Sequence, residues 1–302
     1  MYENPINSIS SELKQVDEKI CNILSENRNF LTKNFLEYIL TGSKKIRSTI
    51  ALLAAKAFCG SVSDAQITVC AIGEIIHNAS LIHDDIVDKS NLRRGKSSFN
   101  SVFGNYAAVL GGDFLISIVL KELLKLNNDN VLKRFANMFL TICDGEINQL
   151  GEKNQIISVE KYLEKSEKKT AELFKTILFS VFAAENLTEH FDFAEKFGKN
   201  FGIAFQIRDD VSNCRQNPTD KPVGSDLENG ICTLPIIFYA ENKNIKNFSE
   251  IDFSDLQNSC AISKSADCIN KFTNNALDLL TDFSDNQYAD ALRNLCEELK
   301  RI

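Results

Sequence analysis

The sequence has little that interrupts a helix. It contains only 4 proline and 13 glycine residues among 302, and three of the prolines fall in one short region, at Pro218, Pro222 and Pro235. Proline and glycine are the main breakers of helices, and no alternating pattern is long enough to predict a sheet. The chain is therefore predicted to be mostly α-helical.

Tryptophan is absent, and the nine cysteines form no Cys-x-x-Cys pair. An odd number of scattered cysteines with apolar neighbours argues against zinc and disulfides, and favours small buried residues in a reducing cytoplasm. The N-terminal stretch lacks the charged-then-apolar pattern of a secretion signal, and no apolar run approaches the length of a membrane span. We therefore expect a cytoplasmic protein without a membrane span.

The charge balance is acidic, with a formal net charge of −7 and a pI of about 5.2. Nonspecific nucleic-acid binding needs a basic face, so it is disfavoured. Hydrophobic residues make up 44% of the chain, including 21 phenylalanines, which is enough for a substantial core. Because no stretch has the composition of a linker, we expect a single domain over residues 1–302.

Several segments carry apolar residues at steps of three and four, the period of a helix: residues 9–26, 63–88, 159–185 and 193–213. Glycine, proline, asparagine and serine collect at residues 41–45, 89–98, 126–130 and 214–230, which predicts loops there.

An acidic cluster ends the second of these helices. The stretch SLIHDDIVDKSNLRRGK, residues 80–96, contains Asp84, Asp85 and Asp88. On a helix, Asp84 and Asp88 share one face with His77 and Ser80. Like charges four residues apart repel, and the C-terminal end of a helix adds negative charge, so a cation should compensate. Carboxylate oxygens suit Mg²⁺ shared with substrate phosphates, whereas the alternative is a solvated acidic helix end paired with neighbouring arginines.

A second acidic cluster follows another apolar run, in FQIRDDVSN, residues 205–213. There Gln206, either Asp209 or Asp210, and Asn213 are spaced to line one face of a helix. Two such helices could hold several Mg²⁺ ions across a diphosphate. Basic residues that suit phosphate oxygens are also present: Lys44, Lys45, Arg47, Arg93, Arg94 and Lys221.

Six motifs, in order, resemble those of the trans-isoprenyl (polyprenyl) diphosphate synthases, and most closely those of the bacterial octaprenyl-type long-chain synthases. The two acidic stretches are similar to that family's aspartate-rich motifs. The other four are GSKKIRS, DGEINQL, KKTAELF and KPVGSDLENGICTLP. The resemblance implies an all-α, single-domain helical bundle around a central cavity, the isoprenoid synthase type I fold, usually as a homodimer.

The resemblance also implies a reaction, in which isopentenyl diphosphate condenses head-to-tail onto an allylic diphosphate with the help of three Mg²⁺ ions. Asp84 and Asp88 would hold two ions, with Asp85 beside them, and Asp209 would hold the third. Arg93, Lys169 and Lys221 would bind the allylic diphosphate. Isopentenyl diphosphate would be bound by Lys44, Arg47, His77 and Arg94. Thr170 and Gln206 would turn oxygens towards the developing cation. His83 is interpreted as structural, and Glu146 with Gln149 as an ordinary polar pair on a helix.

The chain departs from the family pattern at a few positions. Asn213 stands where the family usually has aspartate, Asp220 replaces a glycine, and Ile231 stands where a lysine is usual. Ser43 and Ser48 replace a glycine and a proline. These departures leave open a weakly active or regulatory subunit of a heteromeric synthase. A terpene cyclase is a further alternative, but it would not need the residues that bind isopentenyl diphosphate.

Product length depends on the residues that precede the first motif. Ala79 and Ser80 are small, whereas family members that stop early often carry a bulky aromatic residue at one of these positions. The growing chain is therefore predicted to enter a tunnel closed by Phe135 or Phe139, giving a hexaprenyl to decaprenyl product of the kind used for a quinone side chain. A short-chain farnesyl or geranylgeranyl synthase remains the alternative. Peripheral contact with the membrane that receives the product also stays open.

Overall fold

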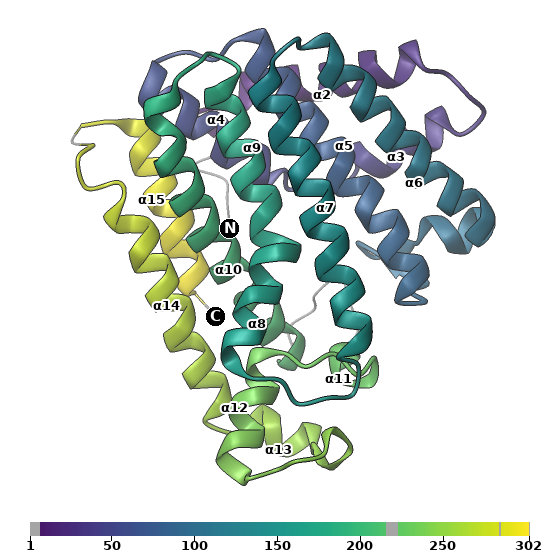
Figure 1. The fold of residues 1–302 in the computed structure, drawn as a ribbon, viewed down its shortest axis with the longest axis vertical. Helices are drawn as coiled ribbons and strands as arrows, with labels where there is room; N and C mark the ends of the chain where they lie inside the picture. Colours follow the sequence, from purple (N-terminus) through teal and green to yellow (C-terminus); the bar gives the residue numbers. More distant parts are fainter. Residues whose placement is uncertain (1–6, 216–222, 284, 302) are drawn as a thin grey trace. The chain divides into compact units, whose positions relative to one another are not determined.

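A computed structural model describes residues 7–215, 223–283 and 285–301, and most of them lie in helices (Figure 1). The prediction of an all-α fold is therefore confirmed. The chain forms two compact units, which are described separately. Unit 1 comprises Met1–Phe135, Thr176–Asp192 and Asp285–Leu292, and unit 2 comprises Ala136–Lys175, Phe193–Ser284 and Arg293–Ile302.

Unit 1 is built around one long helix, α5 (Asp64–Val87), which packs against α2, α3, α4 and α6. The other elements that lie wholly in this unit are α2 (Ser10–Glu26), α3 (Thr32–Leu40), α4 (Ile46–Cys59), β1 (Leu92–Arg93), β2 (Lys96–Ser97), α6 (Phe99–Lys125) and the 3₁₀ turn η2 (Thr188–His190). The helix α6 is interrupted at Gly104, whose φ of 82° is not helical.

Unit 2 contains α8 (Val159–Ser166), the π-helical turn η1 (Glu167–Ala171) and a series of helices towards the C-terminus. That series comprises α11 (Ser225–Glu228), α12 (Leu234–Lys243), the 3₁₀ turn η3 (Phe248–Glu250), α13 (Phe253–Asn258) and α14 (Ala261–Asp278). Four helices have residues in both units: α7 (Asp129–Gly151), α9 (Glu172–Ala183), α10 (Phe191–Cys214) and α15 (Gln287–Lys300).

The sequence explains where α5 begins and why it is buried. Ser63 and Gln66 form a capping box, in which the Ser63 hydroxyl accepts a bond from the Gln66 backbone N–H and the Gln66 side chain accepts one from the Ser63 N–H. The backbone also packs closely, since a Cβ at Gly73 would lie 2.4 Å from Ile177 Cδ1. By length and composition α5 could cross a membrane, although 78% of its most apolar window is buried in the protein, as in the core helix of a soluble protein. No apolar run of that length is predicted from the sequence, so this prediction is wrong for α5.

The third helix expected from the sequence, residues 159–185, is not one regular α-helix. It is divided by the π turn η1, which contains Lys168, Lys169 and Thr170. A π turn inserts an extra residue and rotates the side chains that follow it, and such turns occur often at functional sites. The backbone of α10 packs directly on this region, because a Cβ at Gly202 would lie 2.5 Å from Ala171 Cα.

Three of the expected loops contain regular structure. Within residues 89–98, β1 and β2 form an antiparallel hairpin that pairs Leu92 with Ser97 and Arg93 with Lys96. Helix α7 already begins at Asp129, inside the expected loop 126–130. The expected loop 214–230 contains the short helix α11, and its residues 216–222 lie outside the described part. The two strands and α11 are too short for a periodic pattern to reveal them, whereas for α7 only the first two residues of the helix, Asp129 and Asn130, differ from the prediction.

Candidate active site

At the end of α5, the acidic residues of the first cluster point in different directions. Asp84 and Asp88 are one helical turn apart and partly exposed, and the Asp88 N–H bonds to the Asp84 carbonyl at 2.8 Å. Asp85, by contrast, is fully buried, with an exposed fraction of 0%. Of the three aspartates, Asp84 and Asp88 are therefore the ones that reach the surface at the end of α5.

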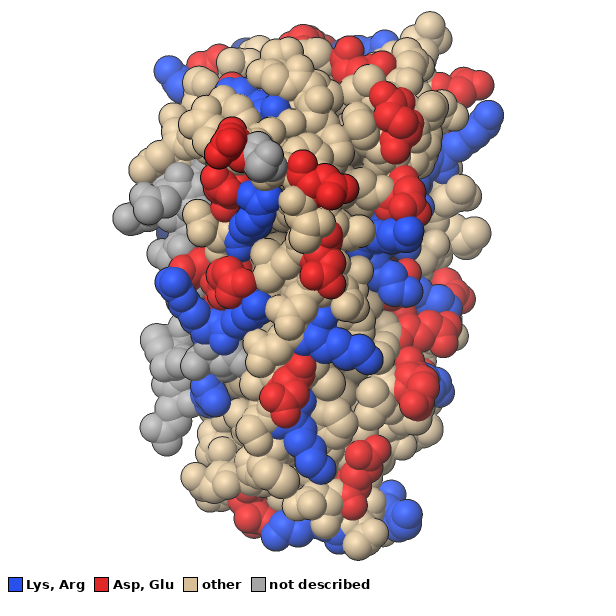
Figure 2. Space-filling model, turned by 90° about the vertical axis from the view of Figure 1, so that its left-hand side faces the viewer, with Lys and Arg blue, Asp and Glu red and all other residues tan. Residues whose placement is uncertain are grey.

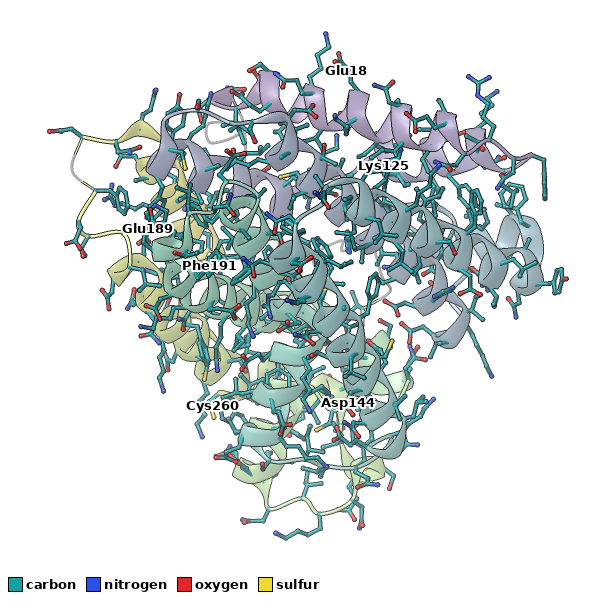
Figure 3. All side chains as sticks on the ribbon, turned by 45° about the horizontal axis from the view of Figure 1, so that its top comes forward. Glu18, Lys125, Asp144, Glu189, Phe191 and Cys260 are labelled. Atoms are coloured by element: carbon teal, nitrogen blue, oxygen red, sulfur yellow. The ribbon has the colours of Figure 1, made fainter. Side chains whose placement is uncertain are left out.

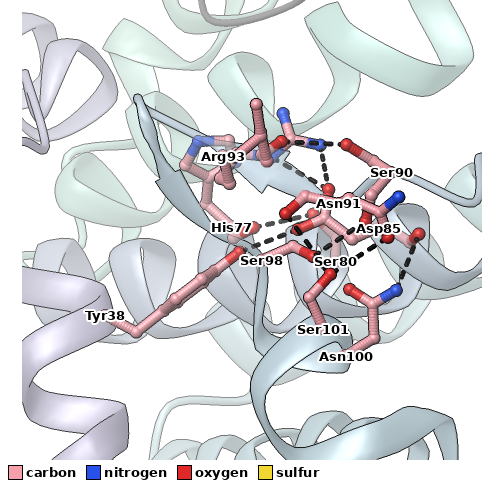
Figure 4. Close-up of polar contacts among 11 residues, drawn as sticks. Tyr38, His77, Ser80, Asp85, Ser90, Asn91, Arg93, Ser98, Asn100 and Ser101 are labelled. Carbon is pink, nitrogen blue, oxygen red and sulfur yellow. Dashed lines mark hydrogen bonds and ion pairs between the residues drawn. The ribbon is translucent and has the colours of Figure 1, made fainter.

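Asp85 ties the β1–β2 hairpin and α3 to α5 (Figure 4). Its Oδ1 accepts a bond from Arg93 Nε at 3.0 Å and also contacts Arg93 Nη2, while its Oδ2 accepts the Tyr38 hydroxyl at 3.3 Å. Its backbone carbonyl accepts the Ser90 N–H at 2.8 Å. Burial, and then the Asp85 carboxylate, raise the pKa of Tyr38, so this hydroxyl remains a proton donor. Arg93, expected to bind substrate, is thus held by Asp85.

Replacing Asp85 by alanine is expected to lower stability strongly. The change leaves the Arg93 guanidinium enclosed without its partner, and breaking a buried ion pair costs about 3–5 kcal/mol. Urea unfolding of Asp85→Ala measures this loss. Asp64→Ala is the matched control, because Asp64 is 82% exposed in its pair with Lys19, and an exposed pair contributes at most about 1 kcal/mol. Equal losses in the two variants would contradict the anchoring role of Asp85.

Several predicted basic residues of unit 1 lie near this hairpin. Arg94 Nη1 is 3.4 Å from the Thr41 carbonyl and 3.5 Å from the Tyr38 carbonyl, which brings it next to the 41–45 loop. Lys44 in that loop is exposed. The neighbouring Lys45 has a left-handed backbone, with φ of 44°, and is paired with Asp17 at 2.6 Å.

His77 lies seven residues before Asp84 on α5, and Ser80 donates its hydroxyl to the His77 carbonyl at 2.8 Å. Burial lowers the pKa of His77 well below its ordinary value, and the positive charges of Arg47, Arg94 and Arg93 lower it further. The ring is therefore neutral at physiological pH and sits in a positive field. Such a field favours an anion.

In unit 2, the π turn places two predicted residues in contact with neighbouring helices. Lys169 Nζ lies 2.8 Å from Glu146 Oε1 and 2.9 Å from Gln149 Oε1 on α7. The Thr170 hydroxyl donates to Gln206 Oε1 at 2.5 Å. Lys168 pairs at 3.0 Å with Asp144, which is labelled in Figure 3. Glu146 and Gln149, interpreted from the sequence as an ordinary polar pair, thus hold Lys169.

The second acidic pair repeats the arrangement of the first. Asp209 is exposed and Asp210 is buried. The Tyr162 hydroxyl donates to Asp210 Oδ2 at 2.6 Å, and Gln206 Nε2 donates to Oδ1 at 2.7 Å. Burial and then the nearby Asp226 raise the pKa of Asp210 to about 7. The helix face predicted to carry Gln206 and Asn213 therefore includes Asp210, whereas Asp209 is exposed to solvent.

Asn213 is buried, and its side chain forms hydrogen bonds with the first residues of α11. Its amide Nδ2 donates to Ser225 Oγ at 3.0 Å, and its Oδ1 accepts the Asp226 N–H at 3.3 Å. In the structure this side chain thus orders the start of α11. Lys221 lies outside the described residues.

The residues predicted to set product length differ in exposure. Ala79 is 1% exposed and lies in the core of unit 1, whereas Ser80 is partly exposed, like Asp84 and His77. Phe135 in unit 1 is fully buried, and Phe139 in unit 2 is partly exposed. His83, interpreted as structural, lies against Gly112, with Nε2 3.2 Å from the Val109 carbonyl.

The acidic residues suit Mg²⁺ by their chemistry. Within residues 7–215, 223–283 and 285–301, no three His, Cys, Asp or Glu side chains gather closely enough to form a complete metal cage. Mg²⁺ commonly takes only one or two carboxylates and completes its shell with water and substrate phosphates. The partly exposed carboxylates of Asp84 and Asp88 fit that mode of binding.

Charges of both signs are intermixed on the face of the molecule drawn in Figure 2. The described residues on that face form no continuous basic area. This agrees with the acidic net charge of −7.

Two tyrosines of the site were not identified from the sequence. Tyr38 and Tyr162 each donate to the buried second aspartate of an acidic pair. Neither lies near its aspartate in the sequence, since they are 47 and 48 residues away. A tyrosine in an apolar helical pattern otherwise indicates only a core position.

Exposed carboxylates beside anchored aspartates, with arginine and lysine side chains nearby, suit a protein that binds a diphosphate together with Mg²⁺. Residues 29–269 match the family model described as polyprenyl synthetase. A prenyl transferase of Cyanidium caldarium is 35% identical, over 82% of this chain and 78% of that protein. The octaprenyl diphosphate synthase of Escherichia coli K12 is 38% identical, over 66% of this chain and 63% of its own length, a little under two thirds. The chain belongs to the polyprenyl synthetase family, a family of prenyltransferases.

Solved structures agree with this assignment. The heptaprenyl diphosphate synthase from Staphylococcus aureus has a TM-score of 0.90 at 25% identity, over 97% of this chain and 98% of that one. A polyprenyl synthase from Caulobacter crescentus CB15, complexed with calcium and isoprenyl diphosphate, has a TM-score of 0.88 at 25% identity, over 100% and 98% of the two chains. The fold is that of the type I isoprenoid synthases.

Proposed function

We propose that the chain condenses isopentenyl diphosphate head-to-tail onto an allylic diphosphate and releases a medium-to-long all-trans polyprenyl diphosphate. The observation that carries this proposal is the repeated acidic pair, in which one aspartate is at least partly exposed and the next is buried and accepts a hydrogen bond from a tyrosine. Membership of a prenyltransferase family supports it. We further propose that residues 1–302 act as one domain around a central cavity, because the family match runs through both units.

In unit 1, Asp84 and Asp88 are proposed to hold Mg²⁺ on the allylic diphosphate. Asp85 supports that site by fixing Arg93, which contacts the same diphosphate. The isopentenyl diphosphate is assigned to Lys44, Arg47, His77 and Arg94. The positive field around the neutral His77 ring supports this assignment.

In unit 2, Asp209 is proposed to hold a third Mg²⁺, and Lys169 and Lys221 to bind the allylic diphosphate. Lys169 would have to leave Glu146 and Gln149 before its ammonium group could bind the diphosphate. Thr170 and Gln206, already joined by a hydrogen bond, are proposed to turn oxygens towards the allylic cation.

The proposed chemistry is ionisation followed by addition. Mg²⁺, when bound, would stabilise the charge that develops on the departing pyrophosphate. Arginine and lysine side chains hold the two diphosphates so that the isopentenyl double bond meets the cation, and enclosure keeps water out. The remaining proton leaves to the pyrophosphate, so no side-chain base is assigned.

A homodimer is proposed from exposed apolar faces. On α6 in unit 1, Tyr106, Leu110, Leu120 and Leu124 are 82%, 51%, 45% and 66% exposed, at helical spacing. On α7 in unit 2, a similar face carries Leu140, Ile147 and Leu150, which are 64–72% exposed. Contiguous exposed apolar surface marks interaction sites, and a second copy of the chain is the partner that the family resemblance implies.

The double variant Leu120→Glu/Leu124→Glu is expected to be monomeric. Two charges placed in an apolar interface lose their hydration without gaining a partner. Light scattering after gel filtration measures the mass. Lys14→Glu, an exposed change on α2, is the control and should leave the mass unchanged. A dimer that survived the double change would place the interface elsewhere.

We propose that the enzyme works in the cytoplasm on small-molecule substrates, without nucleic acid and without spanning the membrane. The nine cysteines are all unpaired, as a reducing compartment favours. The burial of α5 supports its role as a core helix. Contact with a membrane would be peripheral, where the product is delivered.

The test of the proposed function is incorporation of labelled isopentenyl diphosphate. Purified protein with farnesyl diphosphate and Mg²⁺ should give labelled product that is extractable into organic solvent, and EDTA should abolish it. Cyclic hydrocarbon formed from the allylic substrate alone would indicate a terpene cyclase instead. Activity that required a second protein would indicate a subunit of a heteromeric synthase.

A further inference from the structure

Lys165 on α8 is a cation that the sequence analysis did not single out. Its ammonium donates to the Cys232 carbonyl at 3.0 Å and lies 5.8 Å from the centre of the Tyr162 ring. The side chain is only partly exposed. Burial lowers the pKa of Lys165, while the Asp210 carboxylate acts in the opposite direction. Burying a charged group costs free energy, and an apolar residue would pack as well at this position. The charge of Lys165 is therefore expected to have a functional role.

The backbone that Lys165 contacts belongs to the segment 230–233, between α11 and α12. This segment is held from several sides. Asn154 N–H donates to the Gly230 carbonyl at 2.9 Å, and Ile231 N–H donates to the Asp226 carbonyl at 2.8 Å. Ile231 is the position at which the motif resemblance expects a lysine. A lysine ammonium therefore reaches this segment from α8, one residue beyond the position that lacks it.

Charges around Lys165 are unevenly distributed. The carboxylate of Asp210 is buried, and that of Asp226 acts on it as a like charge. Glu152 adds negative charge, and Lys169, four residues after Lys165, adds positive charge. A diphosphate brought to this region would be repelled by the carboxylates of Asp226 and Glu152 unless positive charge balanced them.

We propose that Lys165 is a positioning residue that supplies, from α8, the positive charge that position 231 lacks, and so allows a diphosphate to bind beside Asp209 and Asp210. The proposal rests on the proposed function, because it assigns a diphosphate to this site. It also explains how the chain dispenses with a lysine at position 231. In this chain the positive charge is carried by Lys165 on α8 instead of by a residue of the segment 230–233.

Relocation of the charge tests the proposal. Lys165→Met removes the charge and keeps the length of the side chain, and Ile231→Lys restores a charge on the segment. Lys165→Met is expected to raise the KM for farnesyl diphosphate about 10- to 100-fold, the range for loss of a charged hydrogen-bonding group. The KM for isopentenyl diphosphate should stay constant. The double variant Lys165→Met/Ile231→Lys should recover most of the lost affinity.

Calorimetry with inorganic pyrophosphate and Mg²⁺ measures binding without turnover. The affinity for pyrophosphate should fall in Lys165→Met and recover in the double variant. Lys161→Met is the matched control, since Lys161 lies one turn earlier on α8, is exposed and pairs with Glu152 at 3.0 Å. Its affinities should not change. A Lys165→Met variant that lost thermal stability but kept both affinities, or a double variant that recovered nothing, would overturn the proposal. If the wild-type chain incorporated no isopentenyl diphosphate, the proposed function would fail, and pyrophosphate calorimetry would still decide the role of Lys165.

Discussion

Asp84→Ala is expected to abolish condensation while the protein stays folded. The Asp84 side chain is partly exposed at the end of α5, and none of the core contacts described for Asp85 depends on it. A metal ion contributes several kcal/mol of transition-state stabilisation, and each ~1.4 kcal/mol is a factor of ten, so the rate should fall by at least ~10³-fold. Incorporation of labelled isopentenyl diphosphate measures the rate, and urea unfolding measures the stability.

Two further variants separate this effect from general damage. Asp129→Ala removes an exposed carboxylate from the first turn of α7, and it should leave activity and stability close to those of the wild type. Asp85→Ala should unfold at lower urea concentration, unlike Asp84→Ala. An Asp84→Ala enzyme with a near-normal rate would refute the assignment of a metal to α5.

Ser80→Tyr is expected to shorten the product to farnesyl or geranylgeranyl length. Ser80 lies one turn before Asp84 and is partly exposed on the same side of α5, so a ring there would block the path of a chain that grows from the diphosphate. Product sizes after dephosphorylation, read by chromatography, measure the effect. The smaller change Ser80→Ala is the control and should keep the long product.

The sequence pattern makes both Ala79 and Ser80 candidates and favours Ala79→Tyr as the change that shortens the product, whereas the structure separates the two residues by their exposure. Ala79 is 1% exposed among core side chains, so Ala79→Tyr overpacks the core and should cost about 1–3 kcal/mol of stability. A Ser80→Tyr enzyme that made full-length product, together with a stable Ala79→Tyr enzyme that made short product, would reverse this assignment.

Much of the fold could be predicted from the sequence, because its signals are local and periodic. The scarcity of proline and glycine and the helical spacing of apolar residues indicated α2, α5 and α10 nearly to their ends. The π turn at Glu167–Ala171 could not be seen in this way. It inserts a residue into a pattern that still reads as helical, and its packing against Gly202 depends on α10, about thirty residues further along the chain.

The acidic clusters of the candidate site were evident from spacing and charge, but the roles within each pair were not. Asp84 and Asp85 are adjacent in sequence, and only packing decides which is buried with Arg93. Several contacts of the site join residues that are distant in sequence. They are the hydrogen bonds of Tyr38 and Tyr162 to Asp85 and Asp210, the contacts of Lys169 with Glu146 and Gln149, and the hydrogen bond from Lys165 to the Cys232 carbonyl. Contacts of this kind leave no periodic pattern in one chain.

The proposed function is tested most directly by incubating the purified protein with Mg²⁺, farnesyl diphosphate and labelled isopentenyl diphosphate, and by sizing the products after dephosphorylation. A ladder that ends at one prenyl alcohol between hexaprenyl and decaprenyl is expected. A product only one unit longer than the primer would keep the chemistry and contradict the open path beside Ser80. Absence of any incorporation by the chain alone would contradict the proposal that it is itself a complete polyprenyl diphosphate synthase.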